Sequence, residues 1–175
     1  MKRFRKNELL FSICLIIIYS AQYTLAEKLS AWLGMVDKSR IGTLGHSMGG
    51  NTVQFLFALD ERISFACASG SARSYRNRME NGVGIELASV IPNFYKKYDI
   101  GDLLACGAPR KLLIVSADND KYSRDAEDVV AIAKRSYAEL NAEDNITHVR
   151  YPGGHALTQE RFDDTVKWII SAANS

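Results

Sequence analysis

Residues 111–117, Lys-Leu-Leu-Ile-Val-Ser-Ala, form an almost continuous apolar run. A run of this length without alternation is typical of a strand buried on both faces of a parallel sheet. Shorter stretches that we also interpret as strands occupy residues 40–45, 63–68 and 146–151, and helix-compatible stretches separate them. Strands that alternate with helices predict an α/β fold, a mostly parallel sheet of about four strands flanked by helices.

The stretches between these strands carry helix signals. Residues 24–34 place apolar side chains on one helical face, and residues 51–59 and 124–140 are also compatible with helices. Ser123 is a favourable N-cap for the helix expected over 124–140. In the last helix the apolar face expected against the sheet is made of Phe162, Val166, Ile169 and Ile170.

Composition excludes several classes of protein. With 47% hydrophobic and 24% charged residues, the chain has the composition of a globular domain, not of a disordered tail or a multi-span membrane protein. The net charge is +2, but residues 1–26 carry four basic side chains and one acidic, which leaves a net charge of −1 on residues 27–175. We therefore expect no nucleic-acid partner. The widely spaced Cys14, Cys67 and Cys106 are expected to be free thiols, and no motif predicts a metal or a cofactor.

The first 26 residues form a leader in which a basic stretch precedes the apolar run 9–19. This order is that of a signal peptide, although the run is short for a membrane span. Three interpretations stay open: an export signal or membrane anchor that contacts the membrane through 9–19, a native buried element, or a misread start. We accordingly expect one of two locations. The protein is exported or membrane-anchored if the leader is a true signal, and cytoplasmic if it is not. The domain proper is expected over residues 27–175.

The segment Gly45-His46-Ser47-Met48-Gly49 fits the pattern G-x-S-x-G, and it lies between an expected strand and an expected helix. In this setting a tight turn holds the serine in a strained backbone state and projects its hydroxyl above the sheet. We expect Gly45 and Gly49 to leave room where a Cβ would clash. The backbone N–H of Met48 is the expected oxyanion donor. The alternative is a glycine-rich turn that binds phosphate at the start of the helix.

A nucleophilic serine needs a base, and the chain has three histidines. His46 adjoins the serine and is expected to point away from it across the turn. His148 lies inside a strand pattern. His155 follows the last expected strand, at the carboxyl end where parallel sheets place their sites. His155 is therefore the predicted base.

Together these segments resemble the α/β-hydrolase superfamily, and most of all its dienelactone-hydrolase-like and acetyl-esterase-like branch. The resemblance runs from about Glu27 to the end of the chain. It rests on the elbow, on residues 37–42, 58–63 and 108–116, and on Tyr151-Pro152-Gly153-Gly154-His155. True dienelactone hydrolases use a cysteine nucleophile, and the serine at position 47 favours an ester over a dienelactone substrate.

The resemblance implies that the third catalytic residue, an acid, lies between the serine and the histidine in the chain. Asp118 and Asp120 both follow the strand over 111–117. The turn after this strand commonly reads G-x-x-D in the family. Ala117 takes the place of the glycine here, and this favours Asp120 over Asp118.

The resemblance also implies about a hundred residues before the elbow, which hold the early strands and a second oxyanion donor. Only 44 residues precede Gly45. The chain is therefore expected to be the C-terminal part of a hydrolase domain, with residues 40–45 at an edge of its sheet.

Residues 71–110 form an insertion rich in arginine and aromatic side chains. These side chains either line a pocket for an anionic substrate or serve as surface charge and packing. The substrate-binding residues are not assigned.

The predicted function is that of a serine hydrolase that cleaves a small-molecule carboxylic ester through an acyl-enzyme, with Ser47 as nucleophile, His155 as base and Asp120 as acid. The alternatives are a peptidase or thioesterase of the same fold, and a non-catalytic remnant of a hydrolase. With one recognisable oxyanion donor, the 175-residue chain is expected to hydrolyse activated esters slowly or not at all.

Overall fold

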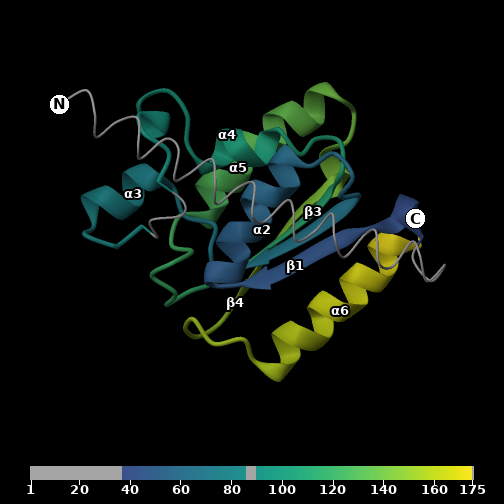
Figure 1. The fold of residues 1–175 in the computed structure, drawn as a ribbon. Coiled ribbons are helices and arrows are strands. Elements are labelled where there is room, and N and C mark those ends of the chain that lie inside the picture. Colours follow the sequence, from purple (N-terminus) through teal and green to yellow (C-terminus); the bar gives the residue numbers. More distant parts are fainter. Residues whose placement is uncertain (1–36, 86–89, 175) are drawn as a thin grey trace.

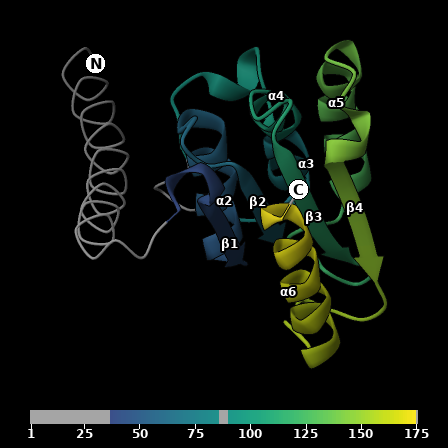
Figure 2. The same cartoon turned by 90° about the vertical axis from the view of Figure 1, so that its right-hand side faces the viewer.

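The computed structural model describes residues 37–85 and 90–174. These residues form a four-stranded parallel sheet with helices on both faces (Figure 1, Figure 2). The strands lie in the order β1 (Gly42–His46), β2 (Phe65–Ser69), β3 (Lys111–Ala117) and β4 (Ile146–Tyr151). The predicted fold class is confirmed, and each predicted strand agrees with the observed one to within two residues.

The helices cover the two faces of the sheet unequally. One face packs against α2 (Met48–Leu59), α4 (Ile100–Ala105) and α5 (Ala126–Glu139), and its core includes the fully buried Phe57, Leu104, Leu112 and Ile114. The other face packs against α6 (Gln159–Ala173) through a smaller cluster, with Cys67, Leu113 and Val115 beneath Trp168. The helix α3 (Tyr75–Glu80) and the 3-10 turns η1 (Lys38–Arg40), η3 (Phe94–Lys96) and η4 (Glu143–Asn145) lie in the connections.

The strand register brings the loops that matter for function to one edge of the sheet. His46 pairs with Ser69, Ser69 with Val115, and Val115 with Val149, so the four strands finish close to one level. Because all four strands are parallel, the loops after them lie at the same carboxyl edge, where α/β sheets place their binding sites. The segments that carry Ser47, Asp120 and His155 are therefore neighbours.

The strand β1 is the outermost strand of the described sheet, as predicted for residues 40–45. Its Leu44 side chain is 46% exposed. The leader over residues 1–26 and the helix expected over 24–34 lie outside the described residues. In the described part of the chain, no helix is long and apolar enough to cross a membrane.

The prediction for the buried face of α6 is wrong. Phe162 and Ile170 are exposed, whereas Arg161 and Thr165 are buried. Trp168, on the same face as these two, packs against Phe65 with ring centroids 6.5 Å apart. The helix is rotated because the buried guanidinium of Arg161 and the indole of Trp168 fix the face that meets the sheet, and the apolar stripe turns partly to solvent.

The prediction for the N-cap of α5 is also wrong. The cap residue is Asp125, which makes no side-chain capping bond. The Ser123 hydroxyl instead donates to Oδ2 of Asp120, at 2.8 Å. A hydroxyl that satisfies a buried carboxylate is not available to the helix, and the helix starts later than the capping signal indicates.

Candidate active site

Ser47 connects β1 directly to α2 and has an unusual backbone conformation, with φ 58° and ψ −121°. A positive φ at a residue with a Cβ costs on the order of 1–3 kcal/mol and persists only where the surroundings enforce it. The backbone N–H of Ser47 donates to the Ser69 carbonyl at 2.9 Å, which ties the turn to β2. The sequence thus forms the strand–turn–helix that the G-x-S-x-G pattern predicts.

The glycines around Ser47 have different roles from those expected. A Cβ at Gly45 would lie 2.2 Å from the Gly49 carbonyl oxygen, and one at Gly50 would lie 2.3 Å from Ser71 Oγ. A Cβ at Gly49 would meet nothing within 4 Å, so the expected clash at that position is wrong. The close approach of β1 to the first turn of α2 is what requires the glycines at 45 and 50.

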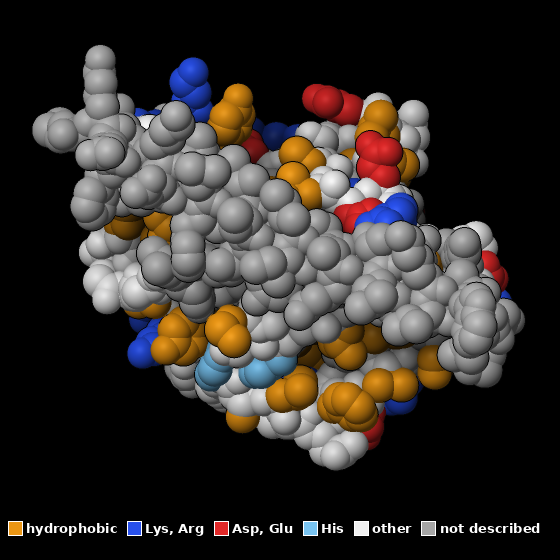
Figure 3. Space-filling view, in the orientation of Figure 1, with side chains coloured by type: hydrophobic (Ala, Val, Ile, Leu, Met, Phe, Trp, Pro, Cys, Tyr) orange, Lys and Arg blue, Asp and Glu red, His pale blue; other side chains and the backbone are white. Residues whose placement is uncertain are grey.

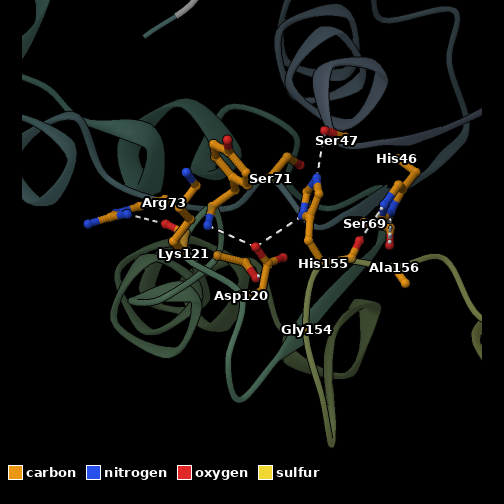
Figure 4. A network of polar contacts seen from close by, with 12 residues as sticks. His46, Ser47, Ser69, Ser71, Arg73, Asp120, Lys121, Gly154, His155 and Ala156 are labelled. Atoms are coloured by element: carbon orange, nitrogen blue, oxygen red, sulfur yellow. Dashed lines mark hydrogen bonds and ion pairs between the residues drawn. The ribbon is translucent and has the colours of Figure 1, made fainter. Parts of the chain in front are cut away.

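The side chains of Ser47, His155 and Asp120 form a continuous hydrogen-bonded chain (Figure 4). Ser47 Oγ lies 2.7 Å from His155 Nε2, and His155 Nδ1 lies 3.0 Å from Asp120 Oδ1. Because Asp120 accepts a hydrogen bond from Nδ1–H, the proton of the neutral imidazole stays on Nδ1. Nε2 is then free to accept the serine proton. The geometry is that of a nucleophile, a base and an orienting carboxylate.

Asp120 is 3% exposed, and two other donors hold its carboxylate. The backbone N–H of Tyr122 donates to Oδ1 at 2.8 Å, and Ser123 donates to Oδ2. Asp118, the other candidate acid, has an exposed side chain and pairs with Arg150, with Oδ1 3.0 Å from Nε. The structure therefore brings Asp120, and not Asp118, to His155.

His46 makes contacts that the sequence analysis does not anticipate. Its Nε2 donates to the backbone carbonyl of His155 at 2.8 Å, and its Nδ1 lies 3.0 Å from Ser69 Oγ. The two imidazole rings are 4.9 Å apart between centroids. Burial lowers the pKa of His46, and the hydrogen bond to the His155 carbonyl opposes this shift only in part. The neutral His46 thus lies beside the predicted base and contacts its backbone.

A second Ser–His pair occurs elsewhere in the sheet, between Ser116 and His148, with Oγ 2.7 Å from Nε2. Ser116 is 1% exposed, and burial lowers the pKa of His148. No carboxylate hydrogen bond to this histidine occurs among the described residues. Because the hydroxyl is inaccessible to a substrate, we interpret this pair as structural.

Met48 is the first residue of α2, a position whose backbone N–H has no acceptor within the helix. The helix begins directly after the nucleophile, so its positive end faces the reacting group. This places the predicted oxyanion donor beside Ser47. The Met48 side chain is 66% exposed.

Two arginines of the 71–110 stretch are buried and bound to the protein itself. The Arg73 guanidinium donates to the Lys121 carbonyl and to Asn77, and Arg78 donates to the Gly84 carbonyl at 3.1 Å. Aromatic side chains of this stretch pack on one another, as Tyr75 does on Phe94. These contacts favour the packing interpretation over recognition of an anionic substrate. In the ranges 37–85 and 90–174, no three His, Cys, Asp or Glu side chains are grouped to hold a metal ion.

The surface near the histidines is largely apolar. Figure 3 shows histidine surface in pale blue bordered by hydrophobic side chains on the face seen in that view. The aromatic ring of Tyr122 packs beside the imidazole of His155, and the two ring centroids are 4.7 Å apart.

No protein-family model matches the chain, and no curated relative matches it in sequence. Solved structures do resemble it. A carbohydrate esterase family 15 glucuronoyl esterase from Caldicellulosiruptor kristjansonii is 20% identical, with a TM-score of 0.65, over 79% of this chain and 44% of the esterase. A glucuronoyl esterase from Solibacter usitatus is 19% identical, with a TM-score of 0.63, over 84% of this chain and 47% of the other.

A third similar structure, the methylesterase BT1017, is 22% identical, with a TM-score of 0.70, over 87% of this chain and 34% of the other. The described fold is therefore part of an α/β-hydrolase fold. The chain spans less than half the length of each of these three proteins.

Proposed function

We propose that this chain carries the nucleophile, base and acid of a serine esterase that hydrolyses carboxylic esters through an acyl-enzyme. The observation that carries the proposal is the hydrogen-bonded chain from Ser47 through His155 to Asp120, with Ser47 strained at the start of α2. The known activities of the similar structures, glucuronoyl esterases and a methylesterase, support an ester as substrate.

In the proposed reaction Ser47 Oγ attacks the ester carbonyl carbon while His155 Nε2 takes the hydroxyl proton. The carbonyl oxygen becomes an oxyanion, which the Met48 N–H stabilises. His155 then gives its proton to the departing alkoxide, and Ser47 is left acylated. Water attacks the acyl group by the same proton route, and this step releases the acid. Asp120 holds the imidazole in the required tautomer and stabilises the imidazolium.

Within the superfamily, the sequence resembles most of all the dienelactone-hydrolase-like and acetyl-esterase-like branch. The serine at position 47 and the absence of a cysteine there favour ester hydrolysis over dienelactone hydrolysis. Peptidase and thioesterase activities share the same three side chains, and a substrate panel separates them from ester cleavage.

The test is the hydrolysis of p-nitrophenyl acetate by the purified chain, by Ser47→Ala and by His155→Ala. We expect turnover that both substitutions abolish, because the attack needs the Ser47 hydroxyl and the His155 base. A panel with a p-nitrophenyl thioacetate, a peptide anilide and a methyl glucuronate identifies the preferred acyl derivative. Turnover that persists in Ser47→Ala would contradict the proposal.

A further inference from the structure

His155 lies in a loop without regular secondary structure, between the end of β4 at Tyr151 and the N-cap of α6 at Thr158. Gly153 in this loop has φ +89°, a left-handed conformation that breaks any continuation of the strand. A loop has no internal ladder of hydrogen bonds to fix its backbone. The position of the imidazole therefore depends on what binds the loop from outside.

Arg161, in the first turn of α6, binds this loop through three carbonyl groups. Its Nη1 donates to the Gly154 carbonyl at 2.8 Å and to the Ala156 carbonyl at 2.6 Å, and its Nη2 donates to the Pro152 carbonyl at 2.8 Å. Arg161 is 4% exposed. The hydrogen-bond acceptors of this guanidinium among the described residues are backbone carbonyls and not carboxylates.

The other two carbonyls of residues 152–156 are also bound. Gly153 accepts from the Asn119 backbone N–H at 2.9 Å, and His155 accepts from His46 Nε2 at 2.8 Å. All five consecutive carbonyls thus receive a donor from outside the loop, and Arg161 supplies three of the five. The segments that bear the acid and the nucleophile supply the remaining two.

We propose that Arg161 is a positioning residue for His155, a role that rests on the proposed function. Its planar guanidinium supplies donors in a fixed fork, so that one side chain sets the relative positions of the carbonyls before and after His155. This fixes the height of the imidazole above the sheet, where Nε2 meets Ser47 Oγ. Within residues 37–85 and 90–174, the guanidinium of Arg161 hydrogen-bonds to the loop backbone and not to the side chains of Ser47, His155 or Asp120.

Loss of the fork leaves three carbonyls without their donor and frees the loop to shift. A displacement of about 1 Å at a reacting group can cost on the order of 10²-fold in rate. The effect is expected in kcat, because Arg161 is buried and its guanidinium is held by backbone carbonyls of the loop, where a substrate has no access to it. A lysine retains the charge but not the fork, and restores part of the loss at most.

The test compares Arg161→Met and Arg161→Lys with Arg135→Met, in the full chain and with p-nitrophenyl acetate. Arg135 is an exposed arginine on α5, on the opposite face of the sheet, and serves as the matched control. We expect kcat to fall about 10–10²-fold in Arg161→Met, with KM changed less than about threefold, and to fall less in Arg161→Lys. Arg135→Met should match the parent. Unchanged kcat in Arg161→Met, or an equal loss in Arg135→Met, would overturn the proposal.

Two further measurements separate positioning from general destabilisation. In Arg161→Ala, millimolar ethylguanidinium should restore part of kcat, whereas ethylammonium at the same ionic strength should not. If Arg161→Met does not fold, Arg161→Lys is measured below its unfolding temperature, and a parental kcat there would overturn the proposal. A rescue that is equal for both cations would overturn it as well.

An NMR measurement keeps this proposal distinct from the proposed function. The Nδ1 proton that His155 shares with Asp120 gives a downfield imidazole signal, assigned by its loss in Asp120→Asn. We expect this signal to be present in the parent and in Arg135→Met, and to be lost or exchange-broadened in folded Arg161→Met. A parent that shows the signal but no Ser47-dependent hydrolysis would contradict the function alone, and an unchanged signal in Arg161→Met would contradict the positioning role alone.

Discussion

The imidazole of His46 hydrogen-bonds to the backbone carbonyl of His155, with Nε2 2.8 Å from the oxygen. The residue that precedes the proposed nucleophile thus holds the loop that carries the proposed base. This contact links the ends of β1 and β4, which are the two outermost strands of the described sheet. The distance between Ser47 and His155 is therefore set by more than their own hydrogen bond.

Replacing His46 tests this link. His46→Phe keeps a ring beside His155 but removes the donor to its carbonyl, and we expect kcat for p-nitrophenyl acetate to fall on the order of tenfold. The free energy of unfolding should fall by about 1–2 kcal/mol, the usual cost of a lost hydrogen bond to a half-buried acceptor. His46→Gln keeps an amide donor, so its kcat and its free energy of unfolding should both fall less than those of His46→Phe. Equal kcat in His46→Phe and the parent would contradict the link.

The choice between the two candidate acids is tested by a matched pair of isosteric substitutions. Asp120→Asn should lower kcat by about 10³–10⁴-fold, because an amide can stabilise the wrong tautomer of His155 and cannot stabilise an imidazolium. Asp118→Asn removes an exposed ion pair with Arg150 and should leave kcat within about twofold of the parent. Steady-state kinetics at neutral pH measure both. The reverse order of effects would assign the acid to Asp118.

Much of this arrangement follows from sequence patterns, and the exceptions have physical reasons. The strand over 111–117 is recognisable because burial on both faces demands apolar side chains along almost all of its length. His155 is predictable because it follows the last strand. The preference for Asp120 over Asp118 comes from the turn pattern of the family, since both aspartates follow the strand over 111–117. The burial of Arg161 is not predictable, because the sequence does not distinguish a buried arginine that binds carbonyls from a solvent-exposed one. The buried face of α6 is mispredicted for that same reason, since Arg161 takes a place assigned to apolar side chains.

The glycines of the turn at Ser47 provide a second matched pair. Gly45→Ala should lower the free energy of unfolding by about 1–3 kcal/mol, because its Cβ would lie 2.2 Å from the Gly49 carbonyl oxygen. Gly49→Ala places its Cβ in open space within α2, where alanine is favoured over glycine by up to about 1 kcal/mol. Urea unfolding at one pH measures both. A larger loss in Gly49→Ala than in Gly45→Ala would contradict the described packing.

The buried histidines make stability depend on pH in a definite direction. Burial lowers the pKa of His46 and of His148 below the ordinary value of 6.5, so each binds a proton less readily in the folded chain than in the unfolded one. As the pH falls from about 6.5 through the lower folded pKa, the unfolded chain takes up more protons and the free energy of unfolding decreases. More than about one pH unit above 6.5 both histidines are neutral in both states and contribute no slope.

The contribution of His148 is isolated by His148→Gln, which retains a polar partner for Ser116. Urea unfolding at pH 7.5, 6.5, 5.5 and 5.0 should show a smaller decrease in the variant than in the parent over the acidic part of this range. Identical slopes would show that His148 titrates alike in the folded and unfolded chains.

The proposed role of Ser47 as the nucleophile is best tested by identifying the residue to which a fluorophosphonate attaches. Ser116 provides an internal comparison, because its hydroxyl also hydrogen-bonds to a histidine but is buried. Mass spectrometry of the labelled and digested chain should locate a single phosphonyl adduct on Ser47. Labelling should be absent in Ser47→Ala, strongly slowed in His155→Ala and unchanged in Ser116→Ala. An adduct on another residue, or no adduct on the folded parent chain, would contradict the account.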